Sequence, residues 1–210
     1  MENPICGTFT QVTQARRITL KKEFVRKGIH LCTALVPVSL RLHYRFTIAS
    51  LALLLAVYCT AEALRRHGHT IPLVSALTMV AARARDAARF VLGPVTLVVG
   101  VLITALAFPP IPAAVGIYAL AFGDGFASLA GKLWGRTPNP FAPGKTVVGT
   151  LACFIAVFLS AFAVTGSPGQ AFAIALAGMF LESLPLKDFD NLVIPIALAA
   201  LNQALPLGNR

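Results

Sequence analysis

The sequence predicts an all-α polytopic membrane protein with about seven transmembrane helices plus one amphipathic or interfacial helix. Hydrophobic residues make up 57% of the 210-residue chain, charged residues only 12%, and the mean hydropathy is +0.76. This composition is typical of chains whose main solvent is lipid. Several apolar runs also approach the length of about 20 residues that a helix needs to cross a bilayer. We therefore expect a single integral membrane domain over residues 19–207, preceded by a polar tail at 1–18.

The expected spans follow the apolar runs along the chain. A helix beginning near residue 19 should lead into the first span, which is short and contains Pro37. The run at 71–82 is too short to cross and is expected to be interfacial. Glycines and prolines make 131–146 a polar loop. The seven expected spans are 28–42, 46–64, 90–108, 111–130, 147–165, 170–185 and 192–207.

The charges between these spans predict an orientation. If the amino-terminal tail and alternate loops share one side, that side holds fifteen of the eighteen Lys and Arg residues. Only Arg41, Arg45 and Arg210 fall opposite. The positive-inside rule then places the amino terminus in the cytoplasm and the carboxyl terminus outside, with a bacterial inner membrane as the expected location. The net charge of +10 therefore belongs to loops that face lipid headgroups and phosphates, and no nucleic-acid partner is expected.

Asp124 is the residue around which we expect the chemistry to be organised. It lies between two glycines in an apolar span, and an acid at membrane depth is functional by default. The expected topology brings further acids and bases to the same cytoplasmic face. Because carboxylates hold Mg²⁺ while cations balance phosphate oxygens, this mixture predicts a site for a metal-bound phosphate. The other converging residues are Glu23, Arg26, Lys27, His30, Glu62, Lys145, Glu182, Asp188, Asp190 and Asn191.

Four motifs occur in order between residues 23 and 195. They are Glu23-x-x-Arg26-Lys27-x-x-His30, Gly123-Asp124-x-x-Ala127-x-x-x-Gly131-x-x-x-Gly135, Lys145-Thr146-x-x-Gly149-Thr150, and Glu182 with Asp190-Asn191 and Pro195. Together they resemble the lipid-alcohol kinases, which include dolichol kinase, phytol kinase and the CTP-dependent diacylglycerol kinase. The resemblance implies transfer of a terminal phosphoryl group, commonly from CTP, to the hydroxyl of a membrane lipid. The lipid stays open, as does ATP in place of CTP, and the short chain is similar to compact bacterial-type members.

Roles for individual residues follow from their chemistry and from this resemblance. Asp124 is expected to hold Mg²⁺ or to orient the lipid hydroxyl, and Lys145, after Gly144 at the head of a helix, is placed for phosphate. The loop is not a Walker A loop, since Asn139 stands where that pattern needs glycine. The expected catalytic residues are Asp124, Lys145 and Glu182, and the metal ligands Asp124, Glu182, Asp190 and Asn191. The expected nucleotide or phosphate contacts are Arg26, Lys27, His30, Gly123, Lys132, Gly144 and Thr146.

Some of these residues also have a purely structural explanation. Arg26 and Lys27 could have no role other than setting the membrane orientation of the first helix. His30 could be an interfacial residue that is hydrogen-bonded to a backbone carbonyl. Lys132 is the main structural candidate as a partner for Asp124. Such roles would need no ligand.

Two further patterns are best explained by helix packing. Glu62 precedes Arg65 and Arg66 by three and four residues, which favours an ion pair along one helix. Gly131 and Gly135 have the GxxxG spacing that often marks close helix contact.

Two functions from other classes remain open. A cytidylyltransferase that makes a CDP-lipid would also place acids at the cytoplasmic end of its helices, and the Lys187-Asp188 pair resembles part of its signature. Its product, pyrophosphate, differs from the CDP that a kinase releases. A small transporter could use Asp124 and Glu182 as a proton or cation relay. The crowding of carboxylates on one face favours the enzyme, and a homodimer is left open.

Overall fold

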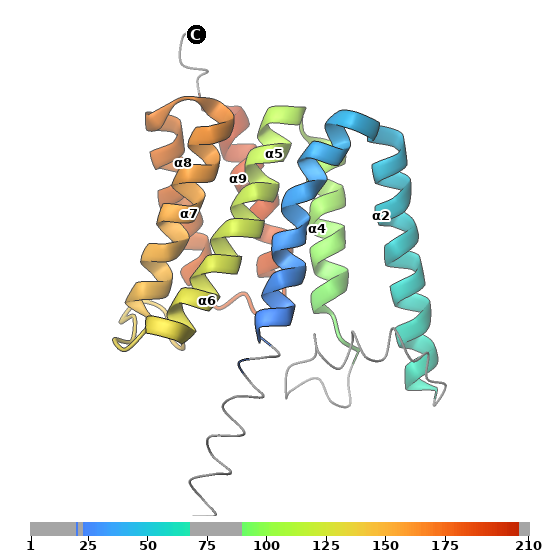
Figure 1. Cartoon of the computed structure of the whole chain (residues 1–210), viewed down its shortest axis with the longest axis horizontal. Helices are drawn as coiled ribbons and strands as arrows, with labels where there is room; N and C mark the ends of the chain where they lie inside the picture. The colour runs from blue at the N-terminus through green and yellow to red at the C-terminus, as the bar shows by residue number, and fades with distance from the viewer. Residues whose placement is uncertain (1–19, 21–22, 68–89, 206–210) are drawn as a thin grey trace, which may run out of the picture.

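The chain is all-helical over the residues that the computed structural model describes, which are 20, 23–67 and 90–205 (Figure 1). No β-strand occurs in these ranges, which confirms the expected all-α class. The tail at 1–18 and the expected interfacial run at 71–82 lie outside the described residues. The elements are η1 (Thr33–Leu35), α2 (Val36–Arg66), α4 (Gly93–Ala107), α5 (Pro110–Tyr118), η3 (Ala119–Asp124), α6 (Gly125–Trp134), α7 (Val147–Thr165), α8 (Pro168–Ser183) and α9 (Asp190–Ala204).

Within the described residues, three helices are long and apolar enough to cross a membrane. They are Glu23–Arg66, Pro110–Trp134 and Val147–Thr165, and Gly93–Ala107 is a shorter apolar helix. A helical segment overlies each of the seven expected spans, but α4, α8 and α9 fall below the length of a complete span. The count of seven spans therefore stays a prediction.

The first two expected spans form one helical stretch with a sharp break. His43 has backbone angles of φ −144° and ψ 69°, which lie outside the helical region, and the chain turns back at this point (Figure 1). The sequence left residues 43–45 between two spans, so the turn was expected, although no separate loop forms there. Residues 23–32, the helical segment that precedes η1, are called the N-terminal helix below.

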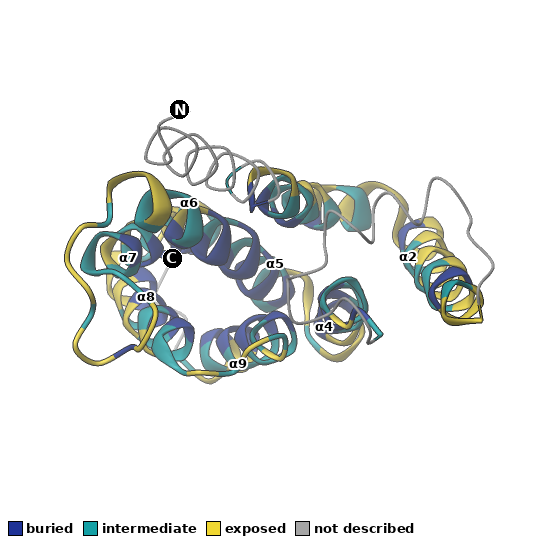
Figure 2. Ribbon diagram, turned by 90° about the horizontal axis from the view of Figure 1, so that it is seen from below, coloured by how far each residue is buried: buried dark blue, intermediate teal, exposed yellow. Residues whose placement is uncertain are grey.

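The helices from α5 to α9 form the compact part of the bundle, and the second half of α2 stands apart beyond α4 (Figure 2). The core contains fully buried aliphatic side chains from four helices, including Ile117, Leu120, Ile174 and Leu198. Large apolar side chains are exposed along α2, where lipid would cover them in a membrane. These exposed residues include Leu42, Phe46, Leu53, Leu54 and Val57.

Glycines let α9 approach its two neighbours at backbone distance. A Cβ on Gly100 of α4 would lie 2.2 Å from the carbonyl oxygen of Asn191, and one on Gly116 of α5 would lie 2.2 Å from that of Pro195. Pro195 has no N–H, so it leaves the Asn191 carbonyl without its helical partner. The bare Cα of Gly100 faces this carbonyl and provides a weak C–H donor in its place.

Replacing Gly100 by alanine is expected to destabilise the protein, because the new methyl group would meet backbone that cannot move independently. Overpacking of this kind costs about 1–3 kcal/mol. Thermal unfolding in detergent should show a midpoint lowered by roughly 2–4 °C per kcal/mol. Gly93→Ala is the matched control in the same helix, because nothing lies within 4 Å of its Cβ position. Equal midpoints for the two variants would contradict the close contact between α4 and α9.

Candidate active site

Residues from seven parts of the chain line one cavity of about 310 Å³ at the end of the bundle where α6 ends and α7 begins (Figure 1). These parts are the N-terminal helix, η3, α6, the loop before α7, the start of α7, the end of α8 and the start of α9. Four cations and four carboxylates lie among the lining residues, so their formal charges cancel. The lining comprises Glu23, Arg26, Lys27, Asp124, Ala127, Ser128, Gly131, Lys132, Gly144, Lys145, Thr146, Gly149, Thr150, Glu182 and Asp190.

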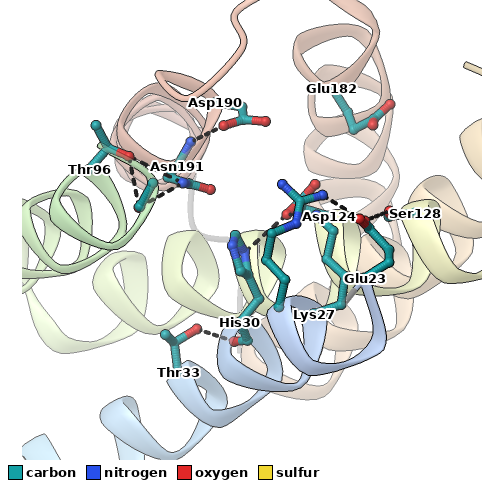
Figure 3. Close-up of polar contacts among 12 residues, drawn as sticks. Glu23, Lys27, His30, Thr33, Thr96, Asp124, Ser128, Glu182, Asp190 and Asn191 are labelled. Carbon is teal, nitrogen blue, oxygen red and sulfur yellow. Dashed lines mark hydrogen bonds and ion pairs between the residues drawn. The ribbon is translucent and has the colours of Figure 1, made fainter. Parts of the chain in front are cut away.

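Asp124 is the last residue of η3, a π-helical turn between α5 and α6. The wider turn changes the angular register of the residues that follow, and such turns are frequent at functional sites. Asp124 is only 7% exposed, and its Oδ2 accepts a hydrogen bond from Lys27 Nζ and lies 3.0 Å from His30 Nδ1 (Figure 3). The hydroxyl of Thr33 donates to the His30 carbonyl at 2.6 Å and fixes the backbone below the ring.

Glu23 joins the N-terminal helix to α6. Its carboxylate accepts hydrogen bonds from Arg26 Nη2 at 2.6 Å and from the hydroxyl of Ser128, and lies 2.6 Å from Lys132 Nζ (Figure 3). Lys132 therefore pairs with Glu23, and its alternative structural role as the partner of Asp124 is not observed. The α-helix carries Lys132 eight residues beyond Asp124, about 12 Å along the axis, where it reaches Glu23 instead.

The loop at 135–146 delivers Lys145 to the cavity. Its Nζ lies 2.7 Å from Glu182 Oε1, so the loop and the end of α8 meet across the site. Gly144 has φ +79°, a conformation that favours glycine. Thr146 is the N-cap of α7, and its hydroxyl accepts a hydrogen bond from the amide of Gly149, as the expected helix start requires.

Asn139, the residue that departs from the Walker A pattern, has a structural role. Its side-chain amide donates to the hydroxyl of Thr150 at 2.9 Å, and its oxygen accepts from the amide of Phe141. Gly131 and Gly135 pack against Thr146. A Cβ on Gly131 would lie 2.9 Å from the Thr146 hydroxyl oxygen, and a Cβ on Gly135 would lie 2.4 Å from it. The glycine pair therefore forms the close contact that its spacing predicts, and it holds the loop against α6.

Most of the residues expected at the site line this cavity, but His30, Gly123 and Asn191 do not. His30 lies behind the lining and contacts Asp124. A Cβ on Gly123 would lie 2.7 Å from Val157 Cγ2, so this glycine faces α7 in the core. Asn191 is buried and donates from Nδ2 to the Gly93 carbonyl at 3.3 Å and to Thr96 Oγ1 at 3.2 Å. Its neighbour Asp190 does line the cavity, and the Asp190 carboxylate accepts a hydrogen bond from the backbone N–H of Asn191.

Sequence reasoning missed one hydroxyl residue of the cavity, Ser128, and named another, Thr150, only as a member of a motif without a role. A signal for Ser128 was present, because it follows Asp124 by four residues and so shares its helix face. Glu62, by contrast, lies outside the site. Arg65 contacts it at 2.7 and 2.8 Å, as its spacing predicts, and the Val91 amide donates to it at 3.0 Å.

The carboxylates do not form a ready metal site. Within the described ranges, no group of three or more His, Cys, Asp or Glu side chains is placed to hold an ion. Asp124 and Glu182 instead each contact a lysine. The cavity is therefore a set of ion pairs whose members could exchange partners with a ligand that carries both positive and negative charge.

Comparison with curated proteins finds relatives of one kind. The chain is 30% identical over 124 residues to "Probable phytol kinase 1, chloroplastic" of Oryza sativa and 33% identical over 124 residues to "Probable phytol kinase, chloroplastic" of Triticum aestivum. It is 35% identical over 99 residues to "Phytol kinase" of Synechocystis. The matches cover 50%, 50% and 43% of this chain, and 39%, 41% and 42% of the three relatives. The chain thus spans less than half the length of the curated relatives it matches.

No family model matches the sequence, and no solved structure matches the chain. The phytol kinases nevertheless agree with the resemblance that the four motifs carry, which was recognised from the residues alone. Over about half of its length the chain is therefore similar to phytol kinases, which supports its resemblance to the lipid-alcohol kinases.

Proposed function

We propose that the protein is an integral membrane kinase that transfers the terminal phosphoryl group of a nucleoside triphosphate, with CTP as the expected donor, to the hydroxyl of a lipid alcohol. The observation that carries the proposal is the cavity in which buried Asp124 lies among four cations. Cations suit the phosphate oxygens of a triphosphate, and a carboxylate suits the metal or the attacking hydroxyl. The relatives named as phytol kinases favour an isoprenoid alcohol over diacylglycerol.

Mg²⁺ fits these residues if it arrives together with the phosphates. The ion is usually held in kinase sites by one or two carboxylates plus substrate phosphates, with water completing its shell. Asp124, Glu182 and Asp190 line the same cavity and offer such carboxylates. Asn191 is held by α4 and is the weakest of the four metal ligands that the sequence suggests. Bound Mg²⁺ would neutralise charge on the phosphates.

The chain's own residues would act mainly by position and charge. Arg26, Lys132 and Lys145 are placed to balance the charge of the triphosphate, while Lys27 stays beside Asp124. The Asp124 carboxylate would orient the lipid hydroxyl and take its proton as the bond from the hydroxyl oxygen to the γ-phosphorus forms. The bond from that phosphorus to the bridging oxygen breaks at the same time, and the nucleoside diphosphate leaves. Burial of Asp124 excludes water, which would otherwise compete with the lipid for the phosphoryl group.

We further propose a seven-span arrangement with this cavity in the cytoplasm of a bacterial cell. The cavity lies at the same end of the bundle as the end of α2, which carries Arg65 and Arg66 (Figure 1). Arg41 and Arg45 flank the break at the opposite end. This separation of charge supports the positive-inside orientation.

The proposal is tested by transfer of radiolabel in detergent with Mg²⁺. γ-labelled CTP and ATP are each offered with phytol, a polyprenol or diacylglycerol, and the lipid fraction is counted. Label in phytol from CTP is the expected result. Label in no lipid, with a folded protein, would overturn the proposal. Release of pyrophosphate would then indicate a cytidylyltransferase, and ion flux in vesicles a transporter.

A further inference from the structure

Asn191, in the first turn of α9, has a side chain whose two ends have different surroundings. It is 4% exposed, and its Nδ2 donates to the Gly93 carbonyl and to Thr96 Oγ1 of α4. The Gly93 carbonyl can only accept, so the nitrogen end must be the one that faces α4. The orientation of the amide is therefore set by its partners.

The oxygen end has no partner in the described part of the chain. Buried acceptors in folded proteins are nearly always hydrogen-bonded to protein, to ordered water or to a ligand, so this oxygen is available to a donor from outside the described residues. Figure 3 shows Asn191 on the side of the site where His30 lies, with its oxygen directed away from Thr96. The carboxylates of Glu182 and Glu23 lie on the other side of that view.

Asn191 also lies deeper in the bundle than Asp124. Gly116 contacts Pro195, and from that level α5 and α9 run in opposite directions, as the chain order in Figure 1 shows. Asn191 is four residues from Pro195 toward the cavity, while Asp124 is eight residues from Gly116. Both separations run toward the charged end, and the one to Asn191 is the shorter, so Asn191 lies deeper in the bundle than Asp124.

We propose that Asn191 Oδ1 accepts a hydrogen bond from the hydroxyl of the lipid alcohol and so binds the acceptor before transfer. The inference rests on the proposed kinase function. The ligand must carry a donor, which an ionised phosphate lacks, and a neutral amide suits a neutral hydroxyl. With its hydrogen on Oδ1 before transfer, the hydroxyl oxygen keeps its lone pairs free to face the cavity where the phosphates would lie, and on transfer this hydrogen leaves Oδ1 for the Asp124 carboxylate. Asn191 is thus a positioning residue for the acceptor.

Binding without nucleotide tests this separately from catalysis. Phytol and its methyl ether differ in the single donor hydrogen, and each is titrated against the protein in detergent. We expect the native protein to prefer the alcohol by about tenfold and Asn191→Leu to bind both alike. Thr96→Val is the matched control: it removes one contact of Nδ2 and leaves Oδ1 in place, so it should keep the preference. Asn191→Ala serves if the leucine variant does not fold.

Several outcomes would overturn the inference. The native protein could bind alcohol and ether equally, or the Asn191 variants could keep the preference for the alcohol. Loss of the preference in Thr96→Val as well would show that Asn191 acts only through α4. A raised Mg²⁺ requirement in the Asn191 variants, with lipid binding unchanged, would make it a metal ligand instead. Because no nucleotide is present, a preserved preference for the alcohol in a protein without transfer activity would refute the kinase and not the subsite.

Discussion

Replacing Asp124 by asparagine is expected to lower phosphoryl transfer by a factor on the order of 10³ or more. The carboxylate is the buried charge closest to both Lys27 and His30, and an amide of the same shape carries no charge and accepts no proton. Whether Asp124 binds the metal or orients the hydroxyl, the charge is needed. The measurement is the initial rate of label transfer at saturating nucleotide and lipid.

A matched set of variants separates this chemical effect from unfolding. Asp124→Asn leaves Lys27 buried without its partner, which costs about 3–5 kcal/mol of stability. The double variant Lys27→Met with Asp124→Asn removes both charges and should recover most of the stability while staying inactive. Glu62→Gln neutralises a fully buried carboxylate outside the cavity and should keep the native rate wherever the protein folds. Transfer above a few per cent of the native rate in the double variant would contradict the role of Asp124.

The helices and the clustering of charged residues at one end of the bundle were predictable, because the lipid environment determines both. An apolar run that crosses lipid by itself must be helical, because only a helix satisfies all of its backbone hydrogen bonds within one segment. Charged residues are then confined to the ends of the helices, so Lys27, Lys145, Glu182 and Asp190 could be expected at one face. The ion pair of Glu62 with Arg65 was predictable for a simpler reason, since its geometry lies within one helix turn.

The partners of the charges inside the cavity were not predictable, because they depend on helix rotations that a hydropathy pattern does not contain. Lys132 seemed placed for Asp124 along one helix, yet the N-terminal helix supplies Lys27 and turns Glu23 toward Lys132. The π-helical turn that ends at Asp124 has no mark in an apolar sequence. The direction of the Asn191 amide likewise depends on α4, which is distant in the chain.

Removing the charge of Glu182 is expected to weaken the dependence of nucleotide binding on Mg²⁺. In the structure the Glu182 carboxylate forms an ion pair with Lys145 at 2.7 Å. A metal-free triphosphate that binds Lys145 must therefore displace this carboxylate, and the two negative charges then repel each other. Mg²⁺ can bind the Glu182 carboxylate while the phosphate binds Lys145. Mg²⁺ thus releases the lysine for the phosphate, and the phosphate releases the carboxylate for Mg²⁺. Couplings of this kind are typically 5–150-fold. In Glu182→Gln, metal-free CTP should bind more tightly than to the native protein, and added Mg²⁺ should improve its affinity much less.

Lys145→Gln is the complementary change and has the opposite expected result. It leaves the Glu182 carboxylate free for the metal but removes a phosphate contact, so CTP should bind weakly with or without Mg²⁺. Calorimetric titration of both variants with CTP, at zero and saturating Mg²⁺, measures the two couplings directly and needs no lipid. If Glu182→Gln keeps the native coupling, the ion pair is only structural, and Asp124 or Asp190 must supply the metal contact. A coupling lost in Glu182→Gln would instead show that the pair reserves both charges for a metal-bound phosphate, which also explains why the cavity is neutral without one.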